Sequence, residues 1–307
     1  MIFQSAFYIA GKNKKAIRIH AMLAIVMVFF SSCQPAEFRG GEVFDGDRAF
    51  HEVEKQVGFG PRFPASEGHE KTREWIVRSL KDRGWHPQIE CFDKQGTELC
   101  NIIAWPREEQ ASSSYILLGA HYDTRRLADS DPAQPFEPVP GANDGASGVA
   151  ILIELARVID PKPLNNDIAL VFFDGEDQGH LDGWDWSEGA RFMAAHMEKP
   201  PAAVIIVDMV GDQDLQLYIE KNSDPELADE IWSIARKQGF SGFIAETRHA
   251  ILDDHLPFAQ RGIPAVDIID IEYSAWHTTR DTIDQISADS LFQVGRTLQL
   301  WVEAQAP

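Results

Sequence analysis

Two kinds of hydrophobic pattern alternate along most of the chain. Short, nearly continuous apolar runs predict strands, because a strand buried on both faces has no polar side; they span residues 101–105, 115–120, 168–173, 202–207 and 265–269. Longer segments with apolar residues at helical spacing predict helices; these span residues 67–83, 146–158, 186–197, 225–238 and 287–304.

This order of elements predicts the α/β class. We expect a single globular domain in which a mixed, mostly parallel central sheet is flanked by helices on both faces. Residues 125–141 contain four prolines and no periodicity, which indicates a long loop. In such folds, long loops and polar residues at the carboxyl ends of the strands form the ligand site.

The first 33 residues have a different pattern, which is typical of an export signal. Four basic residues come first: Lys12, Lys14, Lys15 and Arg18. The apolar run over residues 21–30 follows and is too short to cross a membrane as a helix. Ser31-Ser32-Cys33 then resembles a bacterial lipoprotein signal, in which Cys33 is lipidated and becomes the mature N-terminus. Phe30 departs from the aliphatic residue usual there, and a plain signal peptide is the alternative.

The expected organisation is a signal peptide over residues 1–32, a tether over residues 33–48 and a catalytic domain over residues 49–307. With Cys33 lipidated, the protein is an exported lipoprotein anchored to a membrane, on the periplasmic or cell-surface side. Export also exposes the thiols to oxidising conditions. Cys91 and Cys100 flank a candidate turn at residues 93–96, so either a disulfide or two free buried thiols fits the sequence.

Composition narrows the classes of partner. The chain has 28 Lys and Arg against 48 Asp and Glu, a formal net charge of −20. Such a charge argues against nucleic acid and against anionic lipid surfaces as partners. Three cysteines are too few for a disulfide scaffold, so any metal would be held by carboxylates and histidines.

Acids and histidines gather where the predicted strands end. They are His121, Asp123, Asp174, Glu176, Asp177, Asp208 and, near helix or strand ends elsewhere, Asp144, His277 and Asp281. Taken singly, each has an ordinary explanation: Asp144 as a helix cap, His121 as a core histidine. Together they would crowd one rim of the sheet, which is costly unless a cation neutralises it. Aspartate, glutamate and histidine indicate Zn²⁺ with an open position for substrate.

Several motifs resemble one known family. They are Phe59-Gly60-Pro61-Arg62 with Ser66-Glu67-Gly68, Phe172-Phe173-Asp174-Gly175-Glu176, Asp253-Asp254-His255-Leu256-Pro257-Phe258, Arg261-Gly262-Ile263-Pro264 and Trp276-His277. Their order resembles the zinc exopeptidase superfamily of aminopeptidases and, within it, the glutaminyl-peptide cyclotransferases (glutaminyl cyclases). The resemblance covers roughly residues 50–303.

The resemblance implies a role for each matching residue. Asp144, Asp177 and His277 match the three ligands of a single catalytic zinc. Glu176 matches the general acid–base. Asp208 and Asp253 match acids that hydrogen-bond with the general acid–base. Trp276 matches one aromatic wall of the glutamine pocket, and one or both of Trp184 and Trp186 match the other wall.

Two departures keep a second interpretation open. Asp177 stands where the animal cyclases have glutamate, and residues 141–148 are more similar to the aminopeptidases. His121, Asp144 and Asp208 match residues that help to hold a second zinc in dinuclear aminopeptidases. One zinc ion is therefore expected for a cyclase, and two for the alternative.

The implied activity is conversion of the N-terminal glutamine of peptides or proteins to pyroglutamate, with release of ammonia. The alternative is a zinc aminopeptidase that removes N-terminal residues from peptides. A lipoprotein that only binds carbohydrate or peptide is a third class, but a base beside a zinc ligand has little use in a pure binder.

Overall fold

The computed structural model describes residues 42–108, 114–160 and 166–305. The predicted signal peptide and the lipidation site at Cys33 lie outside these residues. The first helix, α1 (Gly46–Gly58), begins at Gly46, so regular structure starts earlier than the expected domain boundary at residue 49. Among the described residues, no helix is both long and apolar enough to cross a membrane.

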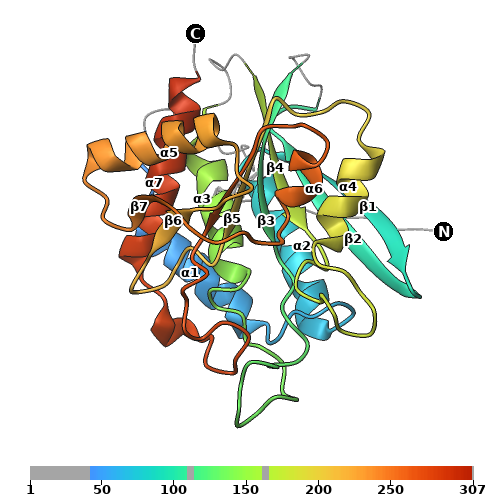
Figure 1. The fold of residues 1–307 in the computed structure, drawn as a ribbon. Helices are drawn as coiled ribbons and strands as arrows, with labels where there is room; N and C mark the ends of the chain where they lie inside the picture. Colours follow the sequence, from blue (N-terminus) through green and yellow to red (C-terminus); the bar gives the residue numbers. More distant parts are fainter. Residues whose placement is uncertain (1–41, 109–113, 161–165, 306–307) are drawn as a thin grey trace, which may run out of the picture. The chain divides into compact units, whose positions relative to one another are not determined.

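A six-stranded sheet forms the centre of the fold (Figure 1). Its strands are β1 (His86–Lys94), β2 (Thr97–Trp105), β3 (Tyr115–His121), β4 (Asp167–Phe173), β5 (Ala203–Asp208) and β8 (Ala265–Ile269), in the order β1-β2-β4-β3-β5-β8. The strands β4, β3, β5 and β8 are parallel, whereas β1 and β2 are antiparallel additions at one edge. The predicted mixed, mostly parallel sheet is confirmed.

Helices cover both faces of the sheet. One face packs against α1, α2 (Glu67–Asp82), α3 (Ala146–Val158), α5 (Pro225–Gln238) and α7 (Ala288–Ala304), and the other against α4 (Glu188–His196) and the short α6 (Leu256–Ala259). Successive side chains of a strand therefore enter different cores: Ile116 and Leu118 face the first layer, and Leu117 faces the second. This two-sided burial explains why the parallel strands are continuously apolar.

Some elements differ from the sequence prediction. The helix predicted from residue 186 begins at Glu188, because Ser187 has a left-handed backbone (φ 61°) that helical residues do not adopt. Helix α1, strand β1 and the small parallel pair β6 (Leu217–Ile219) and β7 (Phe243–Thr247) were not predicted. Strand β1 is mostly exposed at the sheet edge and so lacks an apolar run.

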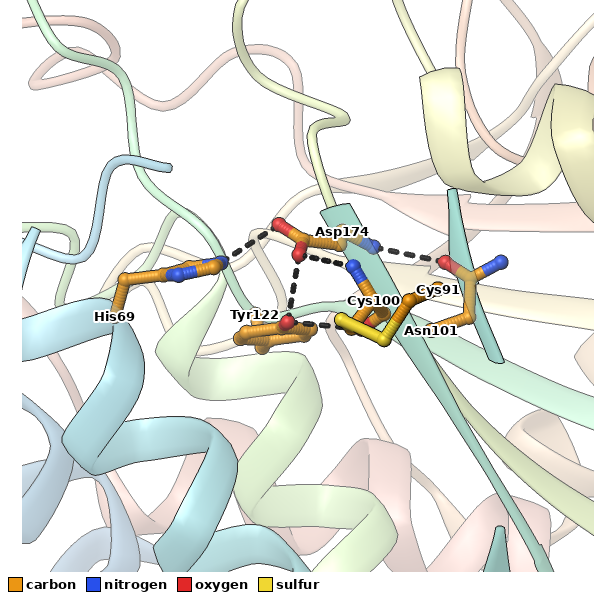
Figure 2. Close-up of a disulfide and its surroundings, with 6 residues drawn as sticks. All are labelled: His69, Cys91, Cys100, Asn101, Tyr122 and Asp174. Atoms are coloured by element: carbon orange, nitrogen blue, oxygen red, sulfur yellow. Dashed lines mark hydrogen bonds and ion pairs between the residues drawn. A yellow bond between two sulfur atoms is a disulfide. The ribbon is translucent and has the colours of Figure 1, made fainter. Parts of the chain in front are cut away.

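The β1–β2 hairpin contains a disulfide between Cys91 and Cys100, which pair directly across the two strands (Figure 2). The backbone N–H of Cys100 also donates to Asp174 at 2.7 Å, and Asp174 accepts from Tyr122 Oη at the same distance. His69 completes this buried group at 2.7 Å from Asp174. Of the two states open from the sequence, the structure has the disulfide, and it lies beside the end of β4.

Candidate active site

The polar residues at the strand ends converge, as the parallel topology requires. His121 and Asp208 are the last residues of β3 and β5, and Glu176 and Asp177 lie in the turn after β4. One cavity is lined by Asp144, Glu176, Asp177, Asp208, Asp253 and His277. His121 lies beneath it and contacts Asp208 at 3.0 Å and Asp144 at 3.2 Å.

Asp144, Asp177 and His277 form a group that fits a metal ion. His277 Nε2 lies 2.9 Å from Asp177 Oδ1 and 3.7 Å from Asp144 Oδ2. Two ligand atoms of a tetrahedral zinc are about 3.3 Å apart. The second carboxylate oxygens Asp144 Oδ2 and Asp177 Oδ2 are buried and have no hydrogen-bond partner among the described residues. Burial and then the charge of Asp144 raise the pKa of Asp177 to about 6, a repulsion that a cation would remove.

A second group shares Asp144 with the first and adds His121 and Asp208. Its potential ligand atoms lie within 4.8 Å of one another, and all three residues are buried. The chain therefore has the residues for one metal ion in the first group, and for a second ion bridged through Asp144.

Glu176 lies beside the metal group but has different surroundings from Asp177. Its side chain is 6% exposed, and Ser187 Oγ donates to Glu176 Oε1 at 3.3 Å. Burial and then the charge of Asp253 raise the pKa of Glu176 well above its usual range. A carboxyl group that is costly to ionise can both accept and return a proton, which is the requirement for general acid–base chemistry.

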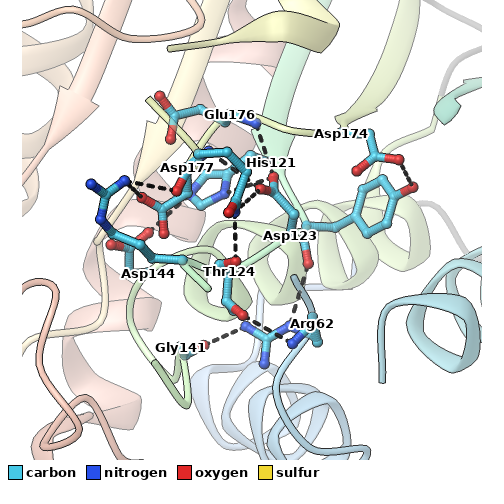
Figure 3. Close-up of polar contacts among 12 residues, drawn as sticks. Arg62, His121, Asp123, Thr124, Gly141, Asp144, Asp174, Glu176 and Asp177 are labelled. Carbon is cyan, nitrogen blue, oxygen red and sulfur yellow. Dashed lines mark hydrogen bonds and ion pairs between the residues drawn. The ribbon is translucent and has the colours of Figure 1, made fainter. Parts of the chain in front are cut away.

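Buried side chains fix the backbone of both ligand turns. Asp123 accepts from the backbone N–H groups of Glu176 at 3.0 Å and Asp177 at 3.3 Å (Figure 3). Asp281 accepts from the N–H of Asp144 at 3.1 Å and from Tyr273 Oη at 2.8 Å. The turns that present Glu176, Asp177 and Asp144 are therefore held by carboxylates from other parts of the sheet rim.

Arg62 performs the same task for the loop before Asp144. It is fully buried and donates to the carbonyl oxygens of Tyr122 at 3.3 Å, Pro140 at 3.0 Å and Gly141 at 2.5 Å. Farther along the loop, Gly145 has φ 65°, and a Cβ there would lie 2.7 Å from the carbonyl oxygen of His121. Only glycine allows this close approach of the Asp144 loop to β3.

Two tryptophans stand beside His277. The ring of Trp276 stacks on His277 with 3.9 Å between centroids, and Trp186 lies 5.8 Å from it on a nearly parallel plane. Both line the cavity of the acids. Trp184, the other residue suggested by resemblance, lines a separate cavity with Phe63 and Arg126. Of the two alternatives for the second wall, the structure therefore brings only Trp186 to the site.

Strained backbone also surrounds this cavity. His277 (φ 55°), Met209 (φ 46°) and Ser187 (φ 61°) all have left-handed backbone conformations. Such conformations cost about 1–3 kcal/mol each and persist where the surrounding structure determines them. The sequence pattern indicated neither this strain nor the supporting roles of Arg62, Asp123 and Asp281. It predicted Asp123 and Asp281 only as acids of the rim, and Arg62 only as part of the Phe59–Arg62 motif.

Comparison with known proteins agrees with this geometry. The model of peptidase family M28 matches residues 101–302. A glutaminyl-peptide cyclotransferase from Drosophila melanogaster is 28% identical over 284 residues, which cover 78% of this chain and 77% of the fly protein. The crystal structure of Porphyromonas gingivalis glutaminyl cyclase is 33% identical, with a TM-score of 0.79, and the match covers 86% of this chain and 100% of that one.

A structure described as a leucine aminopeptidase precursor from Bacteroides thetaiotaomicron is similar to the same degree. It is 31% identical, with a TM-score of 0.79, over 85% of this chain and 97% of that one. The fold is therefore shared by chains described as cyclases and as peptidases. The chain belongs to peptidase family M28 and is, within it, a relative of the glutaminyl cyclases.

Proposed function

We propose that this protein is a glutaminyl-peptide cyclotransferase, which converts N-terminal glutamine to pyroglutamate and releases ammonia. The observation that supports this most is that one cavity is lined by Glu176, by the Asp144–Asp177–His277 group and by Trp186 and Trp276, whose rings both lie beside His277. A narrow site with aromatic walls suits a side chain that must fold back on its own amine. The proposed partners are peptide or protein N-termini that bear glutamine.

Asp144, Asp177 and His277 would hold the zinc ion. When bound, zinc supplies a Lewis acid that polarises the γ-carbonyl group of the substrate glutamine. The chain's own part is to place the α-amine of the same residue against that carbonyl carbon, so that a five-membered lactam closes. Because nucleophile and electrophile belong to one residue, orientation accounts for much of the rate.

Glu176 moves the proton. As the amine nitrogen bonds to the γ-carbon, the carboxylate of Glu176 accepts a proton from it, and then returns that proton to the departing amide nitrogen, which leaves as ammonia. The protons balance, since Glu176 ends as it began. Asp208 and Asp253 line the same cavity and complete the buried acidic group around it.

The alternative, a zinc aminopeptidase, is favoured by one specific observation. His121, Asp144 and Asp208 are arranged as a second potential metal group. With two ions, water rather than the substrate amine would be the nucleophile, and the peptide carbonyl the electrophile. Both activities would use Glu176 and the Asp144–Asp177–His277 group, and they differ in the nucleophile.

Product analysis separates them. We would incubate the protein with Gln-Phe-Ala and, separately, with Leu-Phe-Ala, and follow both by mass spectrometry. The proposal expects loss of ammonia from the first peptide and no cleavage of either. Release of free leucine would contradict it and support the peptidase.

Membrane attachment is a separate part of the proposal. We propose that the chain is exported, lipidated on Cys33 and anchored on the periplasmic or cell-surface side. In a bacterial host with the lipoprotein pathway, the wild-type protein should be labelled by a radioactive fatty acid and fractionate with membranes. Equal labelling of Cys33→Ser would exclude that site.

A further inference from the structure

A row of three buried ionisable side chains, Glu220, His255 and Asp267, leads to Asp253. The proposed chemistry uses none of these three. Glu220 directly follows β6, His255 directly precedes α6, and Asp267 lies within β8. Their exposed fractions are 2%, 0% and 0%. Buried charges are costly unless they are paired, so their arrangement requires a structural or functional explanation.

His255 connects the two carboxyl groups. Its Nε2 lies 3.2 Å from Glu220 Oε2, and its Nδ1 lies 3.5 Å from Asp267 Oδ2. Polar atoms of Asp253, His255 and Asp267 in turn lie within 4.8 Å of one another. The row of buried side chains therefore extends from Glu220 through His255 and Asp267 to Asp253, which lines the active-site cavity.

Glu220 is the fixed end of this row. Its Oε1 accepts from the backbone N–H of Ile251 at 2.9 Å, and its Oε2 accepts from the N–H of Asn222 at 2.7 Å and from Ser223 Oγ at 3.2 Å. Burial alone would raise the pKa of Glu220, but His255 and the backbone donors lower it below its usual range. The carboxylate of Glu220 lies 3.2 Å from His255 Nε2 and favours the tautomer of the ring that carries its proton on that nitrogen.

The other end meets the active site. Burial and then the charge of Asp253 raise the pKa of Asp267 well above its usual range. The turn that contains Asp253 and His255 is rigid: the carbonyl oxygen of Asp253 accepts from Leu256 N at 3.0 Å, and that of His255 from Phe258 N at 3.2 Å. Ser223 Oγ, which donates to Glu220, also accepts from the N–H of Asp267 at 3.0 Å.

We infer that Glu220 and His255 are positioning residues, which act through Asp267 to hold Asp253 against Glu176. The inference rests on the proposed function, because it assigns these residues to the reaction that Glu176 performs. Glu220 favours the tautomer of His255 that carries its proton on Nε2, the ring then faces Asp267 through Nδ1 as an acceptor, and the position of Asp267 limits where the Asp253 carboxylate can lie. Glu220, His255 and Asp267 do not line the cavity.

The variant Glu220→Gln tests this with little change of shape. We expect kcat on Gln-Phe-Ala to fall about 10-fold, as for a small misplacement of a catalytic group, while KM stays within about twofold. Zinc content should equal that of the wild type, because Asp144, Asp177 and His277 are untouched. If Glu220→Gln does not fold, His255→Asn takes its place, because it keeps a polar group toward Asp267 but cannot reach Glu220. It should likewise lower kcat and leave KM nearly unchanged.

Glu154→Gln is the matched control. Glu154 is also buried (1% exposed) and also accepts from a backbone N–H, that of Asp45 at 3.1 Å, but it lies on α3 away from the cavity. This variant should lose stability comparably and keep the wild-type kcat. An equal loss of kcat in Glu154→Gln and Glu220→Gln would overturn the inference, since destabilisation alone would then explain both.

Two further measurements separate the inference from the proposed function. If the wild type cleaves Leu-Phe-Ala instead of cyclising Gln-Phe-Ala, the proposed function fails, and the same variants are compared on leucine release. Ring ¹⁵N NMR reports the tautomer without any turnover: His255 should carry its proton on Nε2 in the wild type and lose that preference in Glu220→Gln. A wild-type kcat in Glu220→Gln, an unchanged tautomer, or a metal ion bound by Asp253, His255 and Asp267 would each overturn it.

Discussion

Glu176 and Asp177 are neighbours in sequence, but the fold gives them different environments. Asp177 faces His277 at 2.9 Å and Arg125 at 3.9 Å, which partly offset the burial and the charge of Asp144 that raise its pKa to about 6. Glu176 faces the hydroxyl group of Ser187 and the charge of Asp253, where ionisation is costly. One turn can therefore supply both a metal ligand and a proton carrier, because Asp123 fixes the two backbone N–H groups separately.

The variant Glu176→Gln tests this division of roles. It keeps the shape of the side chain and removes its ability to accept a proton, so turnover should fall by at least about 100-fold. Zinc content, measured by atomic absorption, should stay at the wild-type level. Near-normal turnover would refute the role of Glu176, and loss of zinc would place Glu176 among the ligands.

The charge of Asp253 should set the acid side of the pH profile. Because Asp253 raises the pKa of Glu176, Glu176 becomes protonated as the pH falls, and kcat/KM is then lost. Asp253→Asn removes the like charge, so the pKa of Glu176 falls and the acid limb of kcat/KM should move to lower pH, at reduced maximal activity. A limb that stays in place or moves to higher pH would contradict this coupling.

At the scale of elements, helix α3 connects the core to the metal group. It begins two residues after Asp144 and packs so closely on β5 that a Cβ on Gly148 would lie 2.3 Å from the carbonyl oxygen of Val207. The atom in the way is backbone, which cannot rotate aside. The position of Asp144 therefore depends on this contact as well as on Asp281 and Arg62.

Gly148→Ala should accordingly destabilise the protein by about 1–3 kcal/mol, as overpacking of a core does. Zinc affinity should fall with it, because α3 and the Asp144 turn must shift together. Gly58→Ala, at the end of α1, is the control: a Cβ there meets nothing within 4 Å. Denaturant unfolding should show a lower free energy of unfolding for Gly148→Ala and no loss for Gly58→Ala. Equal stability of the two variants would contradict a role for α3 packing in positioning Asp144.

The parallel core was predictable because each of its strands is a nearly continuous apolar run, and the site was predictable because parallel strands end at one rim. Strand β1 was not predictable, because its edge position leaves it mostly exposed and its sequence has no recognisable pattern of apolar residues. The start of α4 depends on the left-handed backbone of Ser187, which local sequence does not specify. Arg62 and Glu220 act through contacts with residues far along the chain, and a single sequence has no signal for such pairing.

For the molecule as a whole, we expect the acidic rim to depend on a bound cation. Removal of metal with a chelator should abolish turnover and lower the melting temperature, because a ligand bound only by the folded state stabilises it and the carboxylates otherwise repel one another. Added zinc should restore both. Full activity in the metal-free protein would refute a zinc-assisted reaction, and two zinc ions per restored active chain would support the peptidase.

The central claim is that the nucleophile is the substrate's own amine and not water. The direct measurement is the mass of the products formed from Gln-Phe-Ala in water enriched in ¹⁸O. If the amine is the nucleophile, the product is a cyclised peptide that has lost ammonia and contains no ¹⁸O. Heavy oxygen in free glutamine or in Glu-Phe-Ala would show attack by water and contradict it.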